Sequence, residues 1–234
     1  MELTGTVLTK YTHATIVFTK GENSLVVDPG SYTPNSAELV ASAEAVLVTH
    51  DHADHFDAEV LAAALGARPE LTVYAPASVT SALSKALSSA QPSAGDAAGA
   101  ESVGTIVTVS AGDTFTAAGF DVAVFGDDHA VIHRDIPLVQ NVGYLIDGAV
   151  FHPGDAYLEP GVPVETLLMP VSGPWINTEK AVDYVRAVAP TSTIQIHDLM
   201  LSDAGKGSTA QFLGADGLTG VPMTLLAVGE STTL

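Results

Sequence analysis

Residues 45–55 read AVLVTHDHADH, a short apolar run that leads directly into three histidines and two aspartates. In an extended chain residues i and i+2 point to the same side, so His50 and His52 can bind one ion together. Asp54 and His55 are neighbours and cannot share that direction, which leaves them free to bind a second ion. The stretch therefore predicts half of a two-metal site at a strand end, with a surface turn after a buried strand as the alternative.

Four further apolar runs also lead into histidine or aspartate. Functional sites gather at strand ends in layered α/β proteins, so this pattern marks candidate ligands. Imidazole nitrogen suits zinc, iron, copper and nickel, and carboxylate oxygen adds manganese to the choice. The residues found in this way are Asp28 after residues 24–27, His129 after residues 120–125, Asp155 after residues 149–151 and His197 after residues 193–196.

The chain resembles the metallo-β-lactamase-fold hydrolases. Residues 50–55 match the His-x-His-x-Asp-His motif of that superfamily, and the order of His129, Asp155 and His197 matches its remaining metal ligands. Within the superfamily, the chain is most similar to the small single-domain group related to ascorbate-phosphate lactonase-like proteins. The resemblance covers most of the chain and rests on residues 11–15 (YTHAT), 27–30 (VDPG), 128–133 (DHAVIH), 152–155 (HPGD) and 196–198 (IHD).

The resemblance implies a single domain over residues 1–234 with a four-layer α/β-β/α sandwich of the metallo-β-lactamase type. It also implies two divalent transition-metal ions, with Zn²⁺ as the first choice and Mn²⁺ or Fe²⁺ as alternatives. A hydroxide between the two ions would be the nucleophile, and Asp54 would orient it and help move a proton to the leaving group. The implied ligands are His50, His52 and His129 for the first ion, Asp54, His55 and His197 for the second, and Asp155 as the bridge.

His129 and His133 compete for the position of the third histidine. We favour His129, because it follows the strand more directly and matches the family position. His133 is then a candidate for the surroundings of the site or the substrate pocket, or a locally hydrogen-bonded histidine. Its neighbour Arg134 is the natural candidate to bind an anionic substrate group, with an ordinary surface residue as the alternative.

Three other residues are candidates for the surroundings of the site. His13 lies at the start of a β-rich run and could line the site or pack as a satisfied buried side chain. Asp28 resembles the buried aspartate of the family, which we expect to brace the loop of His50 by hydrogen bonds. Trp175, the only tryptophan, could form a wall of the substrate pocket, with core packing as the alternative.

The amino-acid composition limits the kinds of partner that the protein can bind. The 234 residues include eight basic and 27 acidic ones, which gives a formal net charge of −19. This charge opposes binding to nucleic acid or to an anionic membrane through a basic face. No run approaches the roughly 18 apolar residues of a membrane span, and no leader pattern opens the chain. We therefore expect a cytoplasmic enzyme with a small-molecule substrate and leave a homo-oligomer open; without cysteine, disulfides and thiolate ligands are excluded.

The order of predicted elements suggests two β-rich halves, each with helices. The simplest packing of such halves is two sheets face to face with helices outside, which agrees with the fold that the resemblance implies. We expect a mobile surface loop at about residues 88–104, which are rich in Ser, Ala and Gly. Strands are predicted at residues 5–9, 14–19, 24–28, 45–49, 71–74, 105–109, 114–117, 120–125, 143–146, 149–151, 166–169, 193–196 and 223–228, and helices at 34–43, 57–66, 76–87 and from 177 or 178 to just before 190.

The leading functional hypothesis is a metal-dependent hydrolase that acts on an ester, lactone, thioester or phosphoester. One alternative is a non-catalytic metal-binding protein, because ligands reveal a site and not a turnover. A second alternative is a di-iron redox enzyme. The flavin-linked enzymes of that kind replace the second histidine of the motif with Glu, and this chain has His52 there. The bond that is cleaved, the metal and the oligomeric state are left open.

Overall fold

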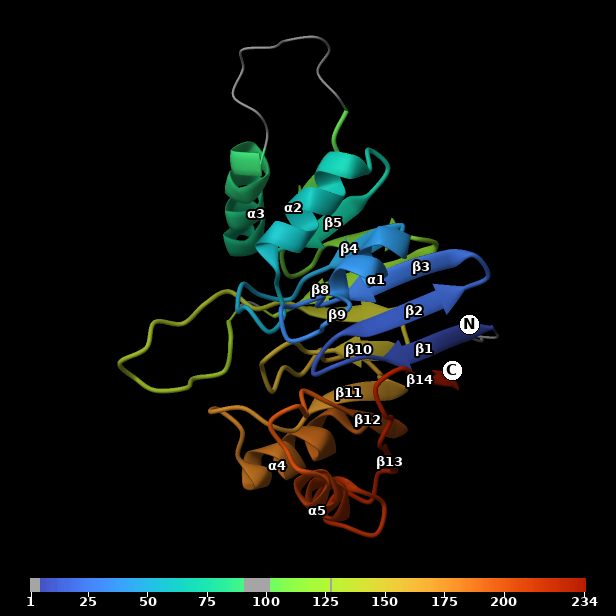
Figure 1. The fold of residues 1–234 in the computed structure, drawn as a ribbon. Helices are drawn as coiled ribbons and strands as arrows, with labels where there is room; N and C mark the ends of the chain where they lie inside the picture. The colour runs from blue at the N-terminus through green and yellow to red at the C-terminus, as the bar shows by residue number, and fades with distance from the viewer. Residues whose placement is uncertain (1–4, 91–101, 127) are drawn as a thin grey trace.

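Two seven-stranded sheets pack face to face, and helices cover the outer face of each (Figure 1). The computed structural model describes residues 5–90, 102–126 and 128–234. The predicted four-layer α/β-β/α sandwich is therefore confirmed.

The first sheet has the strand order β14-β1-β2-β3-β4-β5-β6. Strands β14, β1, β2 and β3 pair antiparallel, whereas β3 to β6 are parallel. The strands are β1 (Thr6–Lys10), β2 (Ile16–Lys20), β3 (Asn23–Val27), β4 (Ala45–Leu47), β5 (Thr72–Ala75), β6 (Thr105–Thr108) and β14 (Glu230–Thr233). The helices that cover it are α1 (Ser36–Ser42), α2 (Ala58–Ala67) and α3 (Ala77–Ala90).

The second sheet repeats this design in the order β13-β12-β11-β10-β9-β8-β7, antiparallel from β7 to β10 and parallel from β10 to β13. The strands are β7 (Thr114–Ala117), β8 (Phe120–Phe125), β9 (Gly143–Ile146), β10 (Val150–His152), β11 (Thr166–Pro170), β12 (Ser192–Ile196) and β13 (Met223–Thr224). The helices α4 (Thr178–Val188) and α5 (Asp203–Leu213) lie on its outer face.

Successive side chains of a strand point to opposite faces of its sheet, and this alternation explains which residues pack into which layer. On β2, Ile16 and Phe18 join the core between the two sheets, whereas Val17, on the opposite face, joins the core under α1 to α3. A strand that is buried on both faces reads as an unbroken apolar run, which is the pattern of β4 before the histidine motif. The third core lies between the second sheet and helix α4, where Val182 and Val185 are buried.

The sheet directions bring six strand ends to one edge of the sandwich. Strands β1, β3 and β4 run in the same direction in the first sheet, and β8, β10 and β12 do so in the second. The segments after these strands carry all the candidate ligands. Sequence positions from 13 to 197 therefore meet at this edge.

The main differences from the predicted elements lie near the end of the chain. Helix α5 was not predicted, because Gly205 and Gly207 give this segment low helix propensity. Strand β14 was also missed, since its sequence ESTT has no apolar alternation. The predicted strand at 223–228 is confined to Met223–Thr224.

The predicted mobile loop at about residues 88–104 is only partly described. Helix α3 continues to Ala90, beyond the predicted end at residue 87. Residues 91–101 lie outside the described part of the chain. In the described residues, no helix has both the length and the apolar character needed to cross a membrane.

Candidate metal centre

Eight histidine and aspartate side chains form two adjacent clusters at this edge of the sandwich. Within each cluster, one ligand atom of every residue lies within 4.8 Å of the others. We call the first the His50 cluster, formed by His50, His52, His129 and Asp155, and the second the His55 cluster, formed by His13, Asp54, His55 and His197.

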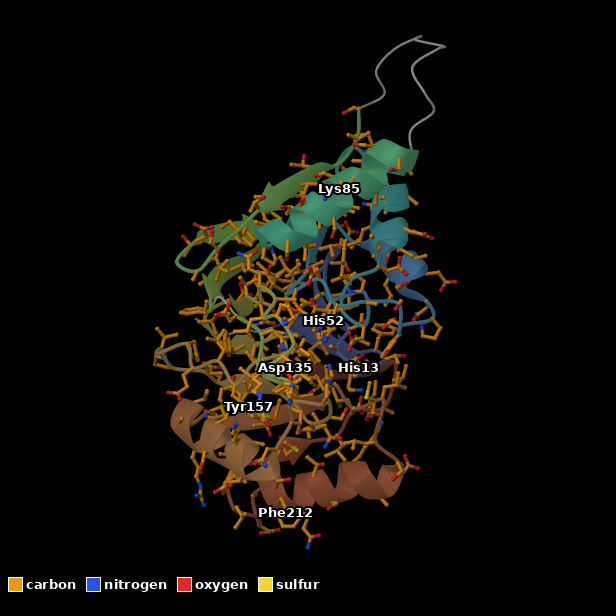
Figure 2. All side chains as sticks on the ribbon, turned by 90° about the vertical axis from the view of Figure 1, so that its left-hand side faces the viewer. His13, His52, Lys85, Asp135, Tyr157 and Phe212 are labelled. Carbon is orange, nitrogen blue, oxygen red and sulfur yellow. The ribbon has the colours of Figure 1, made fainter. Side chains whose placement is uncertain are left out.

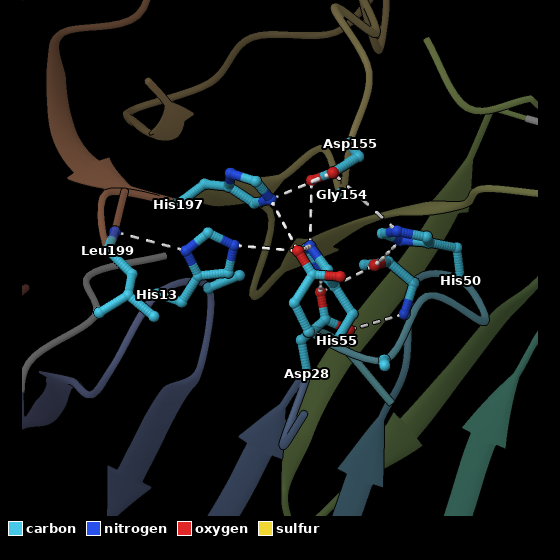
Figure 3. A network of polar contacts seen from close by, with 12 residues as sticks. His13, Asp28, His50, His55, Gly154, Asp155, His197 and Leu199 are labelled. Atoms are coloured by element: carbon cyan, nitrogen blue, oxygen red, sulfur yellow. Dashed lines mark hydrogen bonds and ion pairs between the residues drawn. The ribbon is translucent and has the colours of Figure 1, made fainter. Parts of the chain in front are cut away.

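The loop after β4 carries four of these residues, and Asp28 holds it in place. The Asp28 carboxylate accepts hydrogen bonds of 2.7 Å from the backbone N–H and the hydroxyl of Thr49, and a third of 2.7 Å from Nδ1 of His55 (Figure 3). The backbone N–H groups of His55 and Phe56 bond the carbonyl of His52, which closes the turn. The structure thus places Asp28 beside the loop after β4, which Asp28 holds in position by hydrogen bonds.

Close backbone contacts also shape the site. A Cβ atom on Gly30 would lie 2.0 Å from the carbonyl oxygen of Asp54, so only glycine fits there. Gly154 has a φ of +64°, and a Cβ atom there would lie 2.1 Å from Oδ1 of Asn141. Asn141 is fully buried, donates to the carbonyl of Pro153 and accepts from the backbone N–H of Asp155. It is a positioning residue that no sequence pattern had marked.

Asp155 lies between the two clusters. Its Oδ1 is 3.1 Å from Nε2 of His55, and its Oδ2 is 3.1 Å from Nε2 of His197 and 3.4 Å from Nε2 of His129. Nε1 of Trp175 donates to the same Oδ2 at 3.2 Å, and the indole is buried. One carboxylate therefore faces histidines of both clusters, the placement that a bridging ligand needs.

Hydrogen bonds fix which ring nitrogen of each histidine faces the centre. Nδ1 of His50 bonds the hydroxyl of Thr49, which itself donates to Asp28, and Nδ1 of His129 bonds the carbonyl of Ala130. Nδ1 of His55 bonds the carboxylate of Asp28. Because Nδ1 is the donor in each of these bonds, Nε2 of all three rings faces the centre, and in the neutral ring it offers its lone pair to a cation.

The buried atoms of the centre show that the residues fit a metal ion. In the described chain, six atoms of these residues have no hydrogen-bond partner: Nδ1 of His197, Nε2 of His50, His55, His129 and His197, and Oδ1 of Asp155. A buried polar atom without a partner costs about 1–3 kcal/mol. Cations between the four Nε2 atoms and Oδ1 of Asp155 would satisfy five of the six together, and the donor set suits zinc, manganese and iron.

The electrostatics of the two clusters differ. Burial lowers the pKa of His50 well below its ordinary value, and the neighbouring His55 lowers it further. Burial also lowers the pKa of His52. Burial acts in the same direction on His55, but Asp155 and Asp28 outweigh it and raise the pKa of His55 well above its ordinary value.

The carboxylates respond to the same charges. Burial would raise the pKa of Asp155, but the nearby rings of His55, His129 and His197 hold it well below its ordinary value. Burial likewise opposes ionisation of Asp54, yet the hydrogen bond from His13 and the nearby ring of His197 lower its pKa. Both carboxylates are thus ionised, and their negative charge can stabilise bound cations.

His13 is arranged unlike the other histidines of the centre. Its Nδ1 accepts from the backbone N–H of Leu199 at 3.4 Å, so its Nε2 carries the proton and donates to Oδ2 of Asp54 at 3.0 Å (Figure 3). The ring lies 3.7 Å from that of His197 between centroids, and the His13 carbonyl accepts from the His197 backbone N–H. His13 therefore lines the site as a hydrogen-bond donor to Asp54.

Two candidate residues lie outside both clusters. His133 is exposed and has its Nδ1 3.5 Å from the carboxylate of Asp135, so the structure separates it from His129. Arg134 is also exposed, with Nε 3.8 Å from the same carboxylate. Neither contacts the metal centre. The remaining histidine, His152, is buried and bonds the backbone of Ala14 and Gly154.

Two facing mixed sheets with clustered His and Asp side chains at one edge define the class of metallo-β-lactamase-fold proteins. The family model of the beta-lactamase superfamily domain matches residues 7–197. The chain therefore belongs to the metallo-β-lactamase superfamily.

Known proteins support this assignment. The protein Rv0786c of Mycobacterium tuberculosis is 31% identical over 205 residues, which cover 86% of this chain and 87% of the relative. Among solved structures, a metallo hydrolase from the archaeon Ignicoccus hospitalis aligns with a TM-score of 0.68 at 16% identity, covering 98% of each chain. CmlA, a diiron β-hydroxylase from Streptomyces venezuelae, aligns with a TM-score of 0.67 at 15% identity over 98% of this chain and 54% of that one.

Proposed function

We propose that this protein is a metal-dependent hydrolase that holds two divalent transition-metal ions and cleaves an ester, lactone, thioester or phosphoester of a small molecule. The observation that carries the proposal is the set of buried, unpaired Nε2 atoms of His50, His55, His129 and His197 around the shared carboxylate of Asp155. Metal-dependent hydrolases among its structural neighbours agree with the reaction class. The net charge of −19 argues against nucleic acid as the substrate.

The ligand assignment follows the two clusters. His50, His52 and His129 would hold one ion, and Asp54, His55 and His197 the other, with Asp155 between them. We place His13 outside the ligand set, because its proton lies on the nitrogen that faces Asp54. Zn²⁺ is the ion we expect first, since histidine nitrogen and carboxylate oxygen ligands suit it, with Mn²⁺ and Fe²⁺ as alternatives.

The bound ions would act as Lewis acids that lower the pKa of water towards neutrality and offset negative charge on the reacting oxygen. The chain supplies the proton transfer. The side chain of Asp54 is 17% exposed against 4% for Asp155, so Asp54 is the carboxylate that an incoming water can reach. One oxygen of Asp54 is oriented by His13, which leaves the other to take a proton from water and return it to the leaving group.

The test combines metal analysis with a hydrolysis screen. Protein purified without added metal is assayed before and after chelation on a lactone, a thioester, an aryl ester and a phosphodiester. We expect metal-dependent hydrolysis of at least one substrate, and Asp54→Asn should lower kcat by about a hundredfold or more. Asp135→Asn is the matched control, because this exposed carboxylate lies outside both clusters.

The alternatives give different results. A non-catalytic metal-binding protein would retain its ions and hydrolyse none of these substrates. The likeness to a diiron hydroxylase motivates a parallel assay of oxygen consumption by the iron-loaded protein. Oxygen turnover without hydrolysis would overturn the proposal in favour of redox chemistry. Hydrolysis that persists after complete metal removal would overturn it in favour of a metal-free mechanism.

A further inference from the structure

Exposed apolar side chains flank the metal centre on the side of the His55 cluster. The ring of Tyr32 lies 5.4 Å from that of His13 between centroids, and the backbone N–H of Leu199 bonds the same histidine. Leu199 is 48% exposed and its neighbour Met200 is 57% exposed. Large apolar side chains are thus held in solvent immediately beside His13, the residue of the His55 cluster that bonds Asp54.

A second apolar group flanks the His50 cluster. The loop between β8 and β9 brings Ile136 and Leu138 against His52 and His129, with which they line a small cavity. Both side chains are about half exposed. Figure 1 shows this loop extending well beyond the sheets, on the side of the molecule that faces the viewer in Figure 2.

The base of this loop is tied to the metal centre. The backbone N–H of His129 bonds the carbonyl of Val139, and that of Ala130 bonds the carbonyl of Asp155. The position of Ile136 and Leu138 is therefore linked to two candidate ligands. We name Tyr32, Ile136, Leu138, Leu199 and Met200 the apolar rim.

The positive side chains near the metal centre have acidic partners outside both clusters. In the described part of the chain, no lysine or arginine pairs with a carboxylate of either cluster. Lys10 and Lys206 both pair with Asp198, and Arg134 has Asp135 beside it on the projecting loop. Proteins that select phosphate groups commonly use arginine or lysine, and each of these three basic side chains already has an acidic partner.

Apolar side chains around a polar centre are the usual composition of a small-molecule site, in which a few polar groups act on one bond and the walls bind the rest. We infer that the apolar rim selects a neutral ester, thioester or lactone with an apolar substituent, in preference to a phosphoester. The rim binds the apolar group while the two clusters act on the carbonyl carbon. This inference rests on the proposed hydrolase function and names its substrate class.

The test compares two carboxylic esters that differ only in the apolar part and one phosphodiester. Metal-loaded protein is assayed with p-nitrophenyl acetate, p-nitrophenyl octanoate and bis(p-nitrophenyl) phosphate. We expect kcat/KM to be at least about tenfold higher for the octanoate than for the acetate, the gain expected when additional methylene groups occupy an apolar pocket. The phosphodiester should be the poorest of the three.

Variants separate the rim from general surface hydrophobicity. Leu138→Ser and Leu199→Ser should remove most of the preference for octanoate through a higher KM for that ester, while metal content stays close to that of the parent protein. Val162→Ser is the matched control, because Val162 is 42% exposed in a loop before β11. The control should leave the preference unchanged.

The outcomes separate a failure of the inference about the apolar rim from a failure of the proposed hydrolase function. If the phosphodiester is preferred, or if the control variant lowers the preference as much as the rim variants, the inference is wrong and the hydrolase function stands. If the rim variants change only the oligomeric state in light scattering, the rim is a contact between copies of the chain, and the inference is again wrong. If no substrate is hydrolysed by metal-loaded protein, the proposed function itself fails.

Discussion

The two clusters of the metal centre are oriented by different parts of the molecule. In the His50 cluster, the histidines are held locally, by the hydroxyl of Thr49 and the carbonyl of Ala130. In the His55 cluster, His55 is held by Asp28 and Asp54 by His13, across 27 and 41 positions of the sequence. Neighbours in the chain thus orient His50 and His129 directly, whereas His55 and Asp54 are oriented by residues from distant segments.

The largest effect is expected where the two clusters meet. Asp155→Asn removes the charge that faces histidines of both, so we expect most of the metal and at least a hundredfold of kcat to be lost. Elemental analysis together with hydrolysis measures both. Asp147→Asn is the control, since that buried carboxylate pairs with Lys20 outside both clusters. Full retention of both ions in Asp155→Asn would contradict the role of Asp155 as the ligand shared by the two ions.

The next effect should be confined to the His50 cluster. His129→Ala removes a candidate ligand, and we expect the protein to lose about one ion and most of its activity. His133→Ala should change neither, because the structure leaves this side chain exposed beside Asp135. Metal titration of the two variants in parallel decides between them, and a larger loss in His133→Ala would reverse our assignment of the third histidine.

A smaller effect is expected from the hydrogen bond that orients Asp54. His13→Phe keeps a ring beside His197 but removes the donor, so we expect affinity for the second ion to fall about 10–100-fold, the usual cost of losing such a partner. Stepwise metal titration should show the first ion bound as tightly as before. Equal weakening of both ions would mean that His13 acts through the fold as a whole.

The smallest effect on metal binding should come from the buried ion pair behind His197. Nζ of Lys10 lies 3.0 Å from Asp198, which also pairs with Lys206 at 2.8 Å. Lys10→Met retains the second pair, so we expect about 1–3 kcal/mol less stability in denaturant and only a slight loss of the second ion. Lys20→Met removes a more exposed lysine, and its partner Asp147 keeps the backbone N–H of Asp121 as a donor, so this change should cost under about 1 kcal/mol. A greater stability loss for Lys20→Met would contradict this account of the Lys10 pair.

Sequence reasoning succeeded where the relevant pattern is local. The apolar run before His50 predicted a strand that ends at a site, and β4 does end at Leu47. The same rule led to His129, Asp155 and His197, and the sheet directions then brought them together. Alternation and strand order also predicted the sandwich, because each strand must bury its apolar faces.

The features that sequence reasoning missed depend on three-dimensional contacts. Asn141 orients Asp155 through its amide, but no motif distinguishes it from a surface asparagine. The bond between His13 and Asp54 is set by the approach of two strand ends, which spacing along the chain does not encode. The exposure of His133 and Arg134 likewise follows from the path of a loop without regular structure.

The central claim is that two ions lie on either side of one shared carboxylate. Anomalous diffraction at the zinc edge, from crystals of protein loaded with zinc, tests it most directly. The account predicts two anomalous peaks, one among His50, His52 and His129 and one among Asp54, His55 and His197, with Asp155 between them. A single peak, or peaks outside these clusters, would contradict it.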